Sequence, residues 1–211
     1  MYPINLFLSA RPCLVIGGGN VALQKVQGLL AAQAQVTIIS PLLCRELRLL
    51  ADSGQVHWQK KEYTDGDVKA FDLLICAADN QAVNRAAAAE ARRRRILVNV
   101  CDVPAISDFA APAVIRRGDL LITIGTSGKS PALSRYFRRV LAAEIGAGYG
   151  LFLESLVQLR REARQTLKTP QERQQFWRQA LTDDVMALVA AGNIDAAEAR
   201  LRHAIDRYRF E

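Results

Sequence analysis

The sequence predicts an α/β protein whose first part is a doubly wound parallel sheet. Apolar runs alternate with amphipathic stretches of helical periodicity through residues 1–112. Three of these runs are almost continuously hydrophobic, as in strands that are buried on both faces of a sheet. Repeated strand–helix–strand units join parallel strands through right-handed crossovers. Beyond residue 150 the pattern is helical, so a helical tail is expected after the sheet.

The sheet domain is expected to occupy residues 1–112 as one unit. Strands are predicted at residues 13–16, 35–40, 56–61, 71–78 and 96–100, and helices at 20–33, 41–54 and 81–95. The first helix has apolar residues at the spacing of a helix that covers a sheet: Val21, Leu23, Val26, Leu29 and Leu30.

A smaller α+β segment is expected at residues 113–146. It holds a predicted strand at 120–125 and a helix with Ser130 as N-cap and Pro131 at its first position. This segment is too short to form a core by itself. We therefore expect it to be a dimerisation segment, which pairs with a second copy of the chain and so buries its apolar side chains.

The last segment, residues 147–211, is predicted to be a helical domain of three or four helices. GAGYG (146–150) is expected to break the helical pattern before it. A capping box in TPQE (169–172) starts one helix, Gly192 ends the next, and Asp195 is expected to cap the last.

Charge and composition narrow the class of protein. The chain has 211 residues and a formal net charge of +7, which favours an anionic partner. No apolar run approaches the ~20 residues of a membrane helix, and the N-terminus lacks a signal-peptide pattern, so a cytoplasmic location is expected. No CxxC spacing is present, and free thiols in a reducing compartment are expected at Cys13, Cys44, Cys76 and Cys101.

Three glycines follow the first predicted strand, in CLVIGGGNVALQK (13–25). The spacing Gly17-x-Gly19-x-x-Ala22 at a strand-to-helix junction is the fingerprint of a Rossmann-type dinucleotide-binding domain. Gly17 permits the tight turn, Gly19 lets a pyrophosphate approach the backbone, and Ala22 lets helix and strand pack closely. The first amides of the helix would then face the phosphates. The alternative is a glycine-rich turn needed for packing alone.

The end of the second predicted strand lacks the acid that usually binds the ribose hydroxyls of NAD. Ser40, Pro41 and Leu42 stand there instead, and Asn20 in the glycine turn offers part of the missing polar contact. No arginine follows Ser40 directly, although Arg45 comes shortly after it. Because an arginine usually accommodates the 2′-phosphate of NADP, NAD is favoured over NADP.

Several kinds of active site are excluded by what the sequence lacks. No Tyr-x-x-x-Lys pair is present, GTSGKS lacks the first glycine of a Walker loop, and no metal-ligand spacing occurs. His57 and His203 are expected to be surface or packing residues.

Asp102 in NVCDVP (99–104) directly follows a buried strand, at the edge where open α/β sheets bind ligands. It is the candidate catalytic group; the alternative is an aspartate that only shapes the turn before Pro104.

Five segments together resemble one family. They are similar, in order and spacing, to the precorrin-2 dehydrogenases of sirohaem synthesis, and they read GGGNVALQK, AADNQAVN, NVCDVP, SDFAAPAVI and TSGKSPALSR. That family includes the N-terminal half of bacterial sirohaem synthase and a bifunctional yeast dehydrogenase/ferrochelatase. The resemblance implies that NAD accepts a hydride from precorrin-2 to give sirohydrochlorin, and that the protein is a homodimer. Some members then insert ferrous iron, whereas the methyltransferase half of the fused enzyme is not expected here.

The resemblance also implies roles for individual residues. Asp102 matches the family's proposed general acid/base, and Asn20, Val21, Pro41 and Leu42 match its NAD contacts. A substrate with many carboxylates suits a cleft lined with lysine and arginine. The candidate substrate contacts follow the last predicted strand, before Arg138 and Arg139, and are Thr126, Ser127, Lys129, Ser130 and Arg135. Thr126 stands where the fused enzyme has a phosphorylatable serine, so the chain departs from the family there.

Two other classes of function remain as alternatives. A regulatory NAD-sensing module, like the ligand-binding domains of ion-transport subunits, would bind the cofactor without turnover. Such a module usually carries the acid after the second strand, which is absent here, and it does not account for TSGKSP. A nucleic-acid-binding protein would show a motif or interleaved basic and aromatic residues, and the sequence has neither.

Overall fold

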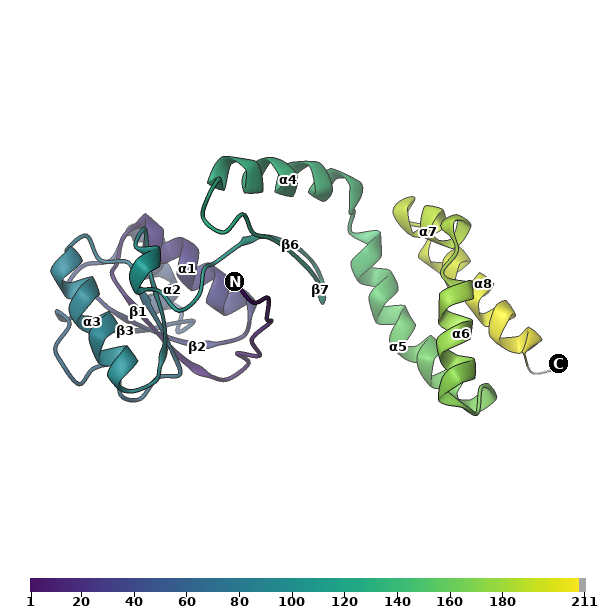
Figure 1. Ribbon diagram of the computed structural model, residues 1–211, viewed down its shortest axis with the longest axis horizontal. Helices are drawn as coiled ribbons and strands as arrows, with labels where there is room; N and C mark the ends of the chain where they lie inside the picture. The colour runs from purple at the N-terminus through teal and green to yellow at the C-terminus, as the bar shows by residue number, and fades with distance from the viewer. Residues whose placement is uncertain (209–211) are drawn as a thin grey trace. The chain divides into compact units, whose positions relative to one another are not determined.

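The computed structural model describes residues 1–208, and the chain divides into two compact units, Met1–Ala111 and Pro112–Glu211. The first unit, coloured purple to teal in Figure 1, contains a five-stranded parallel sheet. Its strand order is β3-β2-β1-β4-β5. Its strands are β1 (Pro12–Ile16), β2 (Gln35–Ile39), β3 (His57–Gln59), β4 (Leu73–Cys76) and β5 (Leu97–Val100). Its helices are α1 (Asn20–Ala31), α2 (Arg45–Asp52), α3 (Gln81–Arg93) and the short 3₁₀ turn η1 (Pro104–Ile106).

Successive side chains of the central strands enter two separate cores, one on each face of the sheet. On one face, Val15 of β1 packs in a core with Val26 of α1 and Leu47 of α2. On the other face, Leu14 packs in a core with Ala88 of α3. Burial on both faces explains why the strand sequences are almost continuously apolar. The predicted doubly wound, Rossmann-type fold is thus confirmed.

Two elements are shorter than predicted, because the loops after β4 and after β2 take up some of their expected residues. The strand expected at 71–78 ends at Cys76, because the backbone of Ala78 is bonded to the side chain of Asn84 instead of a strand. The helix expected at 41–54 begins at Arg45, because the extended Cys44 donates its amide to the carbonyl of Gly18 (2.7 Å). Both loops therefore close on the glycine turn.

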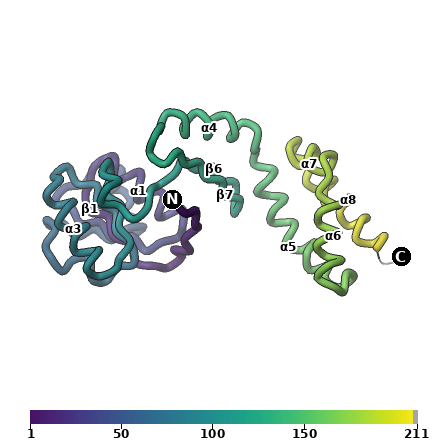
Figure 2. The backbone as a smooth tube through the Cα atoms, in the orientation of Figure 1, coloured from purple at the N-terminus to yellow at the C-terminus, as the bar shows by residue number. Residues whose placement is uncertain are grey.

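The second unit begins with an antiparallel hairpin of β6 (Ala113–Arg117) and β7 (Leu120–Ile124). Helix α4 (Pro131–Glu144) packs against β6, and both figures of the whole chain show it running beside the hairpin (Figure 2). As predicted, Ser130 caps α4 by accepting a hydrogen bond from the amide of Leu133, and Pro131 is the first helical residue. Strand β6 was not expected from the sequence, because Ile115 is its single buried residue and gives no clear alternation.

The helical part of this unit holds α5 (Gly148–Thr166), α6 (Pro170–Ala180), α7 (Asp183–Ala190) and α8 (Ile194–Arg207). They surround a core that includes Leu159, Phe176 and Leu201. The predicted capping box of Thr169 and Glu172 starts α6, and Gly192, with φ +79°, follows the end of α7 as expected. Within residues 1–208 no single helix is long and apolar enough to cross a membrane; α4 and α5 meet that test only as a pair bent by 64°.

One prediction for this tail is confirmed and one is wrong. GAGYG interrupts the helical pattern as expected, because α4 ends at Glu144 and α5 begins at Gly148, although the last three residues of the motif already belong to α5. A β-carbon at Gly148 would collide with the Val189 carbonyl, and one at Gly150 with the Arg117 carbonyl, so these glycines serve close packing. The N-cap of α8 is Asn193, and Asp195 lies inside the first turn, where its charge favours the helix dipole.

Candidate functional site

The glycine turn between β1 and α1 lies at the point where the strand order reverses, between β1 and β4. Gly17 has φ +123°, and its amide donates to the carbonyl of Ile39 (3.0 Å). A β-carbon on Gly17 would collide with the carbonyl of Ala77, in the loop after β4. Gly17 thus allows the β1 and β4 loops to meet, at the edge where open α/β sheets bind ligands.

The other two glycines differ in what surrounds them. A β-carbon on Gly18 would collide with the Leu42 carbonyl, so Gly18 packs against the loop after β2. A β-carbon on Gly19 would meet no atom within 4 Å, so the space beside it is open. Gly19 is the N-cap of α1 and has extended backbone angles of φ −89° and ψ −170°.

The N-terminus of α1 offers free donors beside that space. The first amide bonded within the helix is that of Leu23, which donates to Gly19 (3.0 Å), so the amides of the three residues before it have no helical acceptor. No side chain caps the helix and its first turn has no acid. Free amides and the positive end of a helix dipole make a site for an anion. A dinucleotide pyrophosphate fits this arrangement.

The facing wall of the site is held by Asn84, a residue to which the sequence analysis gave no role. Its side chain is 1% exposed, accepts a hydrogen bond from the amide of Ala78 (3.1 Å) and donates one to the carbonyl of Ala78 (2.7 Å). This pair of bonds fixes the loop after β4 against Gly17. The motif AADNQAVN contains the residue, but its partner lies six positions away and only the fold identifies it.

The predicted contacts after β2 form a tight loop against the glycines. The hydroxyl of Ser40 donates to the carbonyl of Leu42 (2.6 Å), and the carbonyl of Ser40 accepts from the Trp58 indole (2.9 Å). Leu42 is 73% exposed, and Pro41 is exposed beside it. Arg48 stacks over Trp58, with its guanidinium carbon 4.8 Å from the ring centroid. Ser40 therefore shapes this loop, while Pro41 and Leu42 present an apolar surface.

Asp102 lies in a tight turn after β5, the neighbour of β4. The amide of Val103 donates to the carbonyl of Val100 (3.2 Å), and Asp102 has φ +64°, a conformation that aspartate tolerates better than most residues. The side chain is exposed, and within residues 1–208 its carboxylate accepts no hydrogen bond. The turn-shaping alternative thus applies to the backbone of Asp102, but its carboxylate is free to meet a ligand.

Burial disfavours the thiolate form of the two cysteines near this edge, Cys76 and Cys101. Burial, with a smaller effect of Cys101, raises the pKa of the Cys76 thiol to about 12. Burial also raises the pKa of Cys101, and Asp102 adds to this, whereas the charge of Lys25 opposes it. At the start of β1, away from this edge, burial and Asp72 raise the pKa of Cys13 to about 11. These thiols are not thiolate nucleophiles, and all four cysteines are free, as expected.

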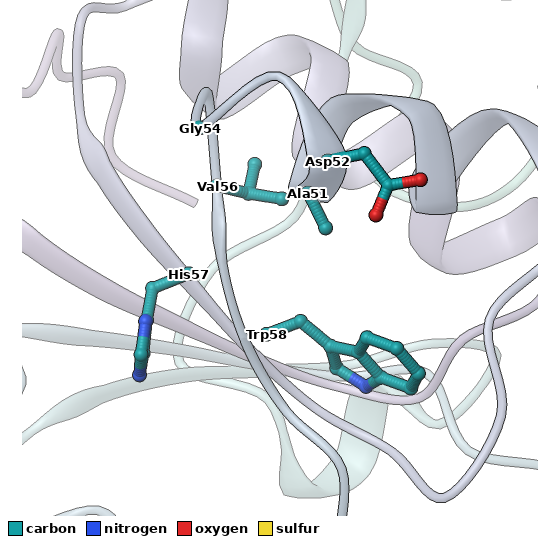
Figure 3. A pocket seen from close by; sticks show the side chains of 6 residues that line it. All are labelled: Ala51, Asp52, Gly54, Val56, His57 and Trp58. Atoms are coloured by element: carbon teal, nitrogen blue, oxygen red, sulfur yellow. The ribbon is translucent and has the colours of Figure 1, made fainter.

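A shallow cavity of about 410 Å³ lies elsewhere in the first unit, between α2 and β3 (Figure 3). Its lining does not include the predicted site residues and consists of Ala51, Asp52, Gly54, Val56, His57 and Trp58. Figure 3 shows His57 pointing away from Asp52 and Trp58, which gives no catalytic arrangement. This agrees with the expectation that His57 is a surface or packing residue.

The candidate substrate contacts lie in the second unit, around the start of α4. Ser127 and Gly128 both have positive φ, 54° and 77°, and the amide of Lys129 donates to the carbonyl of Thr126 (3.0 Å), which closes a tight turn. The hydroxyl of Thr126 bonds the backbone of Ser130 and the hydroxyl of Ser134. Thr126 and Ser130 therefore hold the loop, while Ser127 and Lys129 are exposed.

Arginines follow this turn along α4. They line a cavity of about 750 Å³ between α4 and β6, whose basic residues are Arg116, Arg117, Arg135, Arg138 and Arg139. The guanidinium of Arg117 forms hydrogen bonds within the second unit, to the carbonyls of Ala142 (2.9 Å) and Ile145 (2.8 Å). The lining holds no acid, so this surface is suited to an anion with several carboxylates. Within residues 1–208 no group of His, Cys, Asp and Glu has the arrangement of a metal site.

Comparison with known proteins gives the family. Residues 4–113 match a family model described as "Putative NAD(P)-binding", and residues 148–205 match the "Sirohaem synthase dimerisation region". The chain belongs to this NAD(P)-binding family, and its C-terminal helices also match the sirohaem synthase model. The family expected from the five sequence segments is therefore confirmed. The matched dimerisation region covers α5 to α8, whereas the sequence analysis placed dimerisation at 113–146; those domain boundaries remain a prediction.

Relatives named siroheme synthase match nearly all of the chain. "Siroheme synthase" from Methylococcus capsulatus is 38% identical over 204 residues, which are 97% of this chain and 43% of that protein. "Siroheme synthase 1" from Klebsiella pneumoniae is 36% identical over 205 residues, 97% of this chain and 44% of that protein. The chain thus spans less than half the length of these relatives. A solved structure, "SirC, precorrin-2 dehydrogenase", has the same fold, with a TM-score of 0.78 at 22% identity, covering 98% of this chain and 100% of that chain.

Proposed function

We propose that this protein is an NAD-dependent precorrin-2 dehydrogenase, which converts precorrin-2 to sirohydrochlorin in sirohaem synthesis. The observation that carries the proposal is the open space at Gly19, beside the free amides of α1 and at the same edge of the sheet as the free carboxylate of Asp102. Membership of the sirohaem synthase family supports the choice of substrate.

The residues of the first unit fit NAD. The amides of Asn20 and Val21 would bind the pyrophosphate, Gly17 and Gly19 leave it room, and the loop of Ser40, Pro41 and Leu42 would lie against the adenosine half. No acid in the first turn of α1 opposes the phosphates. When bound, NAD supplies the acceptor for one hydride. NAD is preferred to NADP because no arginine directly follows Ser40 and Arg48 is stacked on Trp58, although Arg45 comes shortly after the strand.

Asp102 would be the group that exchanges protons with the macrocycle. Oxidation of precorrin-2 removes hydrogen as a hydride and a proton, so the protein must supply a base for the proton. The Asp102 carboxylate is exposed, and no hydrogen bond from residues 1–208 occupies it. Its backbone is fixed by the turn after β5, so the carboxylate is held at the sheet edge where the cofactor site lies.

The second unit would bind the carboxylates of the substrate. Lys129 and Arg135 are exposed at the start of α4, and Ser127 lies in the tight turn before them. The family's dimerisation region supports a homodimer. The same Asp102 carboxylate is also the candidate base for inserting ferrous iron into sirohydrochlorin, since that reaction likewise removes protons from the macrocycle nitrogens.

Anaerobic incubation with precorrin-2 and NAD tests the proposal. We expect the macrocycle spectrum to change to that of sirohydrochlorin with one NADH formed per molecule, and no change without NAD. Binding of NAD with no turnover would instead identify a regulatory NAD-sensing module. Ferrous iron is then added to the product; a change to the sirohaem spectrum faster than in protein-free buffer would show iron insertion, and an unchanged rate would limit the activity to dehydrogenation.

A further inference from the structure

The turn that carries Asp102 is fixed on one side by the neighbouring strand. The amide of Cys101 donates to the carbonyl of Cys76 at the end of β4 (2.9 Å), which continues the β4–β5 pairing into the turn. Asp102 itself has φ +64°. A residue other than glycine is strained at positive φ and keeps that conformation only where its surroundings hold it. The other side of the turn therefore also needs a partner.

Ser107 is that partner. Its hydroxyl accepts a hydrogen bond from the amide of Val100 (2.9 Å) and lies 3.0 Å from the carbonyl of Val103 and 3.2 Å from that of Val100. One side chain thus contacts both the first and the last residue of the turn. The hydroxyl has a single proton, so it donates to one of the two carbonyls at a time.

The chain returns to this position through the 3₁₀ turn η1. The amide of Ser107 donates to the carbonyl of Pro104 (3.1 Å), which points the side chain back at β5. The next residue, Asp108, pairs with the free edge of β5: its amide donates to the carbonyl of Val98 (2.8 Å), and its carboxylate accepts from the Val98 amide (3.0 Å). Asp108 therefore pairs with the edge of β5 before the turn, whereas the Ser107 side chain contacts the turn itself, in addition to the hydrogen bond between Val103 and Val100.

Asp108 therefore stabilises the edge of the sheet, whereas Ser107 stabilises the turn that positions Asp102. All the bonds of Ser107 go to the backbone on either side of Asp102, and none goes to the carboxylate. The arrangement holds the position of the carboxylate while leaving its oxygens free. We propose that Ser107 is the positioning residue for Asp102. The inference rests on the proposed function, in which Asp102 exchanges protons with the macrocycle.

Three variants test this role in the full chain: Ser107→Ala, Ser107→Thr and the matched control Asp108→Ala. Threonine keeps the hydroxyl and suits the extended backbone of Ser107 (φ −107°, ψ 143°). Asp108→Ala removes a bond to the same strand edge and the pairing with Arg92 (3.6 Å), but leaves the turn intact. We measure kcat and KM with precorrin-2 and NAD, the unfolding midpoint, and hydrogen exchange at the Val103 amide.

We expect Ser107→Ala to lower kcat about 10- to 100-fold while KM for NAD changes less than about 2-fold, since misplacing a reacting group lowers the rate and not cofactor binding. Ser107→Thr should recover most of that loss. Asp108→Ala should lower the unfolding midpoint to a similar extent and keep kcat within about 2-fold. Exchange at Val103 should become about 10-fold faster in Ser107→Ala and stay unchanged in Asp108→Ala.

Two results would overturn the inference: a normal kcat in Ser107→Ala with active wild type, or an equal loss of kcat in Asp108→Ala. If the wild type itself does not turn over precorrin-2, the proposed function fails. Hydrogen exchange at the Val103 amide then tests whether Ser107 holds the turn. An exchange rate in Ser107→Ala equal to that of wild type would refute this.

Discussion

The α-carbon of Gly17 lies so close to the carbonyl of Ala77 that a β-carbon at residue 17 would collide with it, whereas a β-carbon at Gly19 would meet no atom within 4 Å. The two glycines of the fingerprint therefore serve different purposes. Gly17 is needed by the fold, because it lets the loops after β1 and β4 meet. Gly19 is not needed by the fold, and its missing side chain leaves room for a ligand.

The contrast predicts opposite effects of substitution. Gly19→Leu should abolish NAD binding while the protein stays folded, because the side chain fills the pyrophosphate position. Gly17→Ala should instead lower the free energy of unfolding by about 3 kcal/mol, through backbone strain and collision. Titration calorimetry with NAD and urea unfolding of both variants separate the effects. An unchanged NAD affinity in Gly19→Leu would refute the role given to the glycine turn.

Asn84 should be required for both stability and cofactor binding. Asn84→Ala removes two hydrogen bonds and leaves the partly buried amide and carbonyl of Ala78 without their partner, which costs about 1–3 kcal/mol. The loop that faces Gly17 then loses its anchor, so NAD affinity should fall as well. The control is Asn80→Ala, which removes only the cap of α3. Urea unfolding and calorimetry should find the loss of NAD affinity in Asn84→Ala and not in the control.

The lowered pKa of the Glu90 carboxyl in α3 predicts that the free energy of unfolding depends on pH. Burial alone would raise the pKa of this carboxyl, but hydrogen bonds from Tyr63, the Gly66 backbone and Arg94 outweigh burial and lower the pKa below its ordinary value of 4.5. A carboxyl with a lowered folded pKa stabilises the fold above its unfolded pKa, and this contribution is lost as pH falls through the folded pKa. Wild-type stability should therefore decline below about pH 5.

The variant Glu90→Gln isolates this contribution. It cannot ionise, so its free energy of unfolding should change less than that of wild type between about pH 5 and pH 3. Urea unfolding across this range measures both slopes. Equal slopes in the two proteins would mean that Glu90 does not contribute to the acid sensitivity.

The exposed face of α4 predicts a dimer. Leu133, Phe137 and Val140 are 45%, 43% and 39% exposed and share one face of the helix, beside a two-stranded hairpin that is marginal by itself. Phe137→Glu should convert a homodimer into a folded monomer, and Lys69→Glu, at an exposed position of the first unit outside the matched dimerisation region, should leave the dimer intact. Sedimentation at micromolar concentration gives the masses. A monomeric wild type would contradict the prediction.

Structural features that depend on residues close together in the sequence were predicted, whereas contacts between distant residues were not. The glycine spacing, the cap of Ser130 and the capping box of Thr169 are local, and each was predicted correctly. The helix break at GAGYG was also predicted, but the packing of Gly148 was not, because the carbonyl it packs against, that of Val189, is distant in the sequence. The fold also reveals the roles of Asn84 and Ser107. Asn84 bonds within its own motif, whereas the hydrogen bonds of Ser107 link two motifs that the sequence analysis had treated separately.

In the candidate site, too, the position of a residue was predicted from the local sequence, but its contacts with other segments were not. The sequence placed Asp102 at the sheet edge because a buried strand ends there, but left open whether it only shapes a turn. The positive φ of Asp102 depends on the partners of the turn in β4 and at Ser107, which no local pattern contains. Only the fold separates the role of its backbone from that of its carboxylate.

The central claim is that the carboxylate of Asp102 moves protons during NAD-dependent oxidation of precorrin-2. The most direct test is the single-turnover rate of NADH formation in wild type and in Asp102→Asn, with NAD saturating and oxygen excluded. Asparagine suits positive φ as well as aspartate does, so the turn is preserved while the proton acceptor is lost. We expect a rate lower by about 100- to 10,000-fold with unchanged NAD affinity, and a near-normal rate in Asp102→Asn would contradict the account.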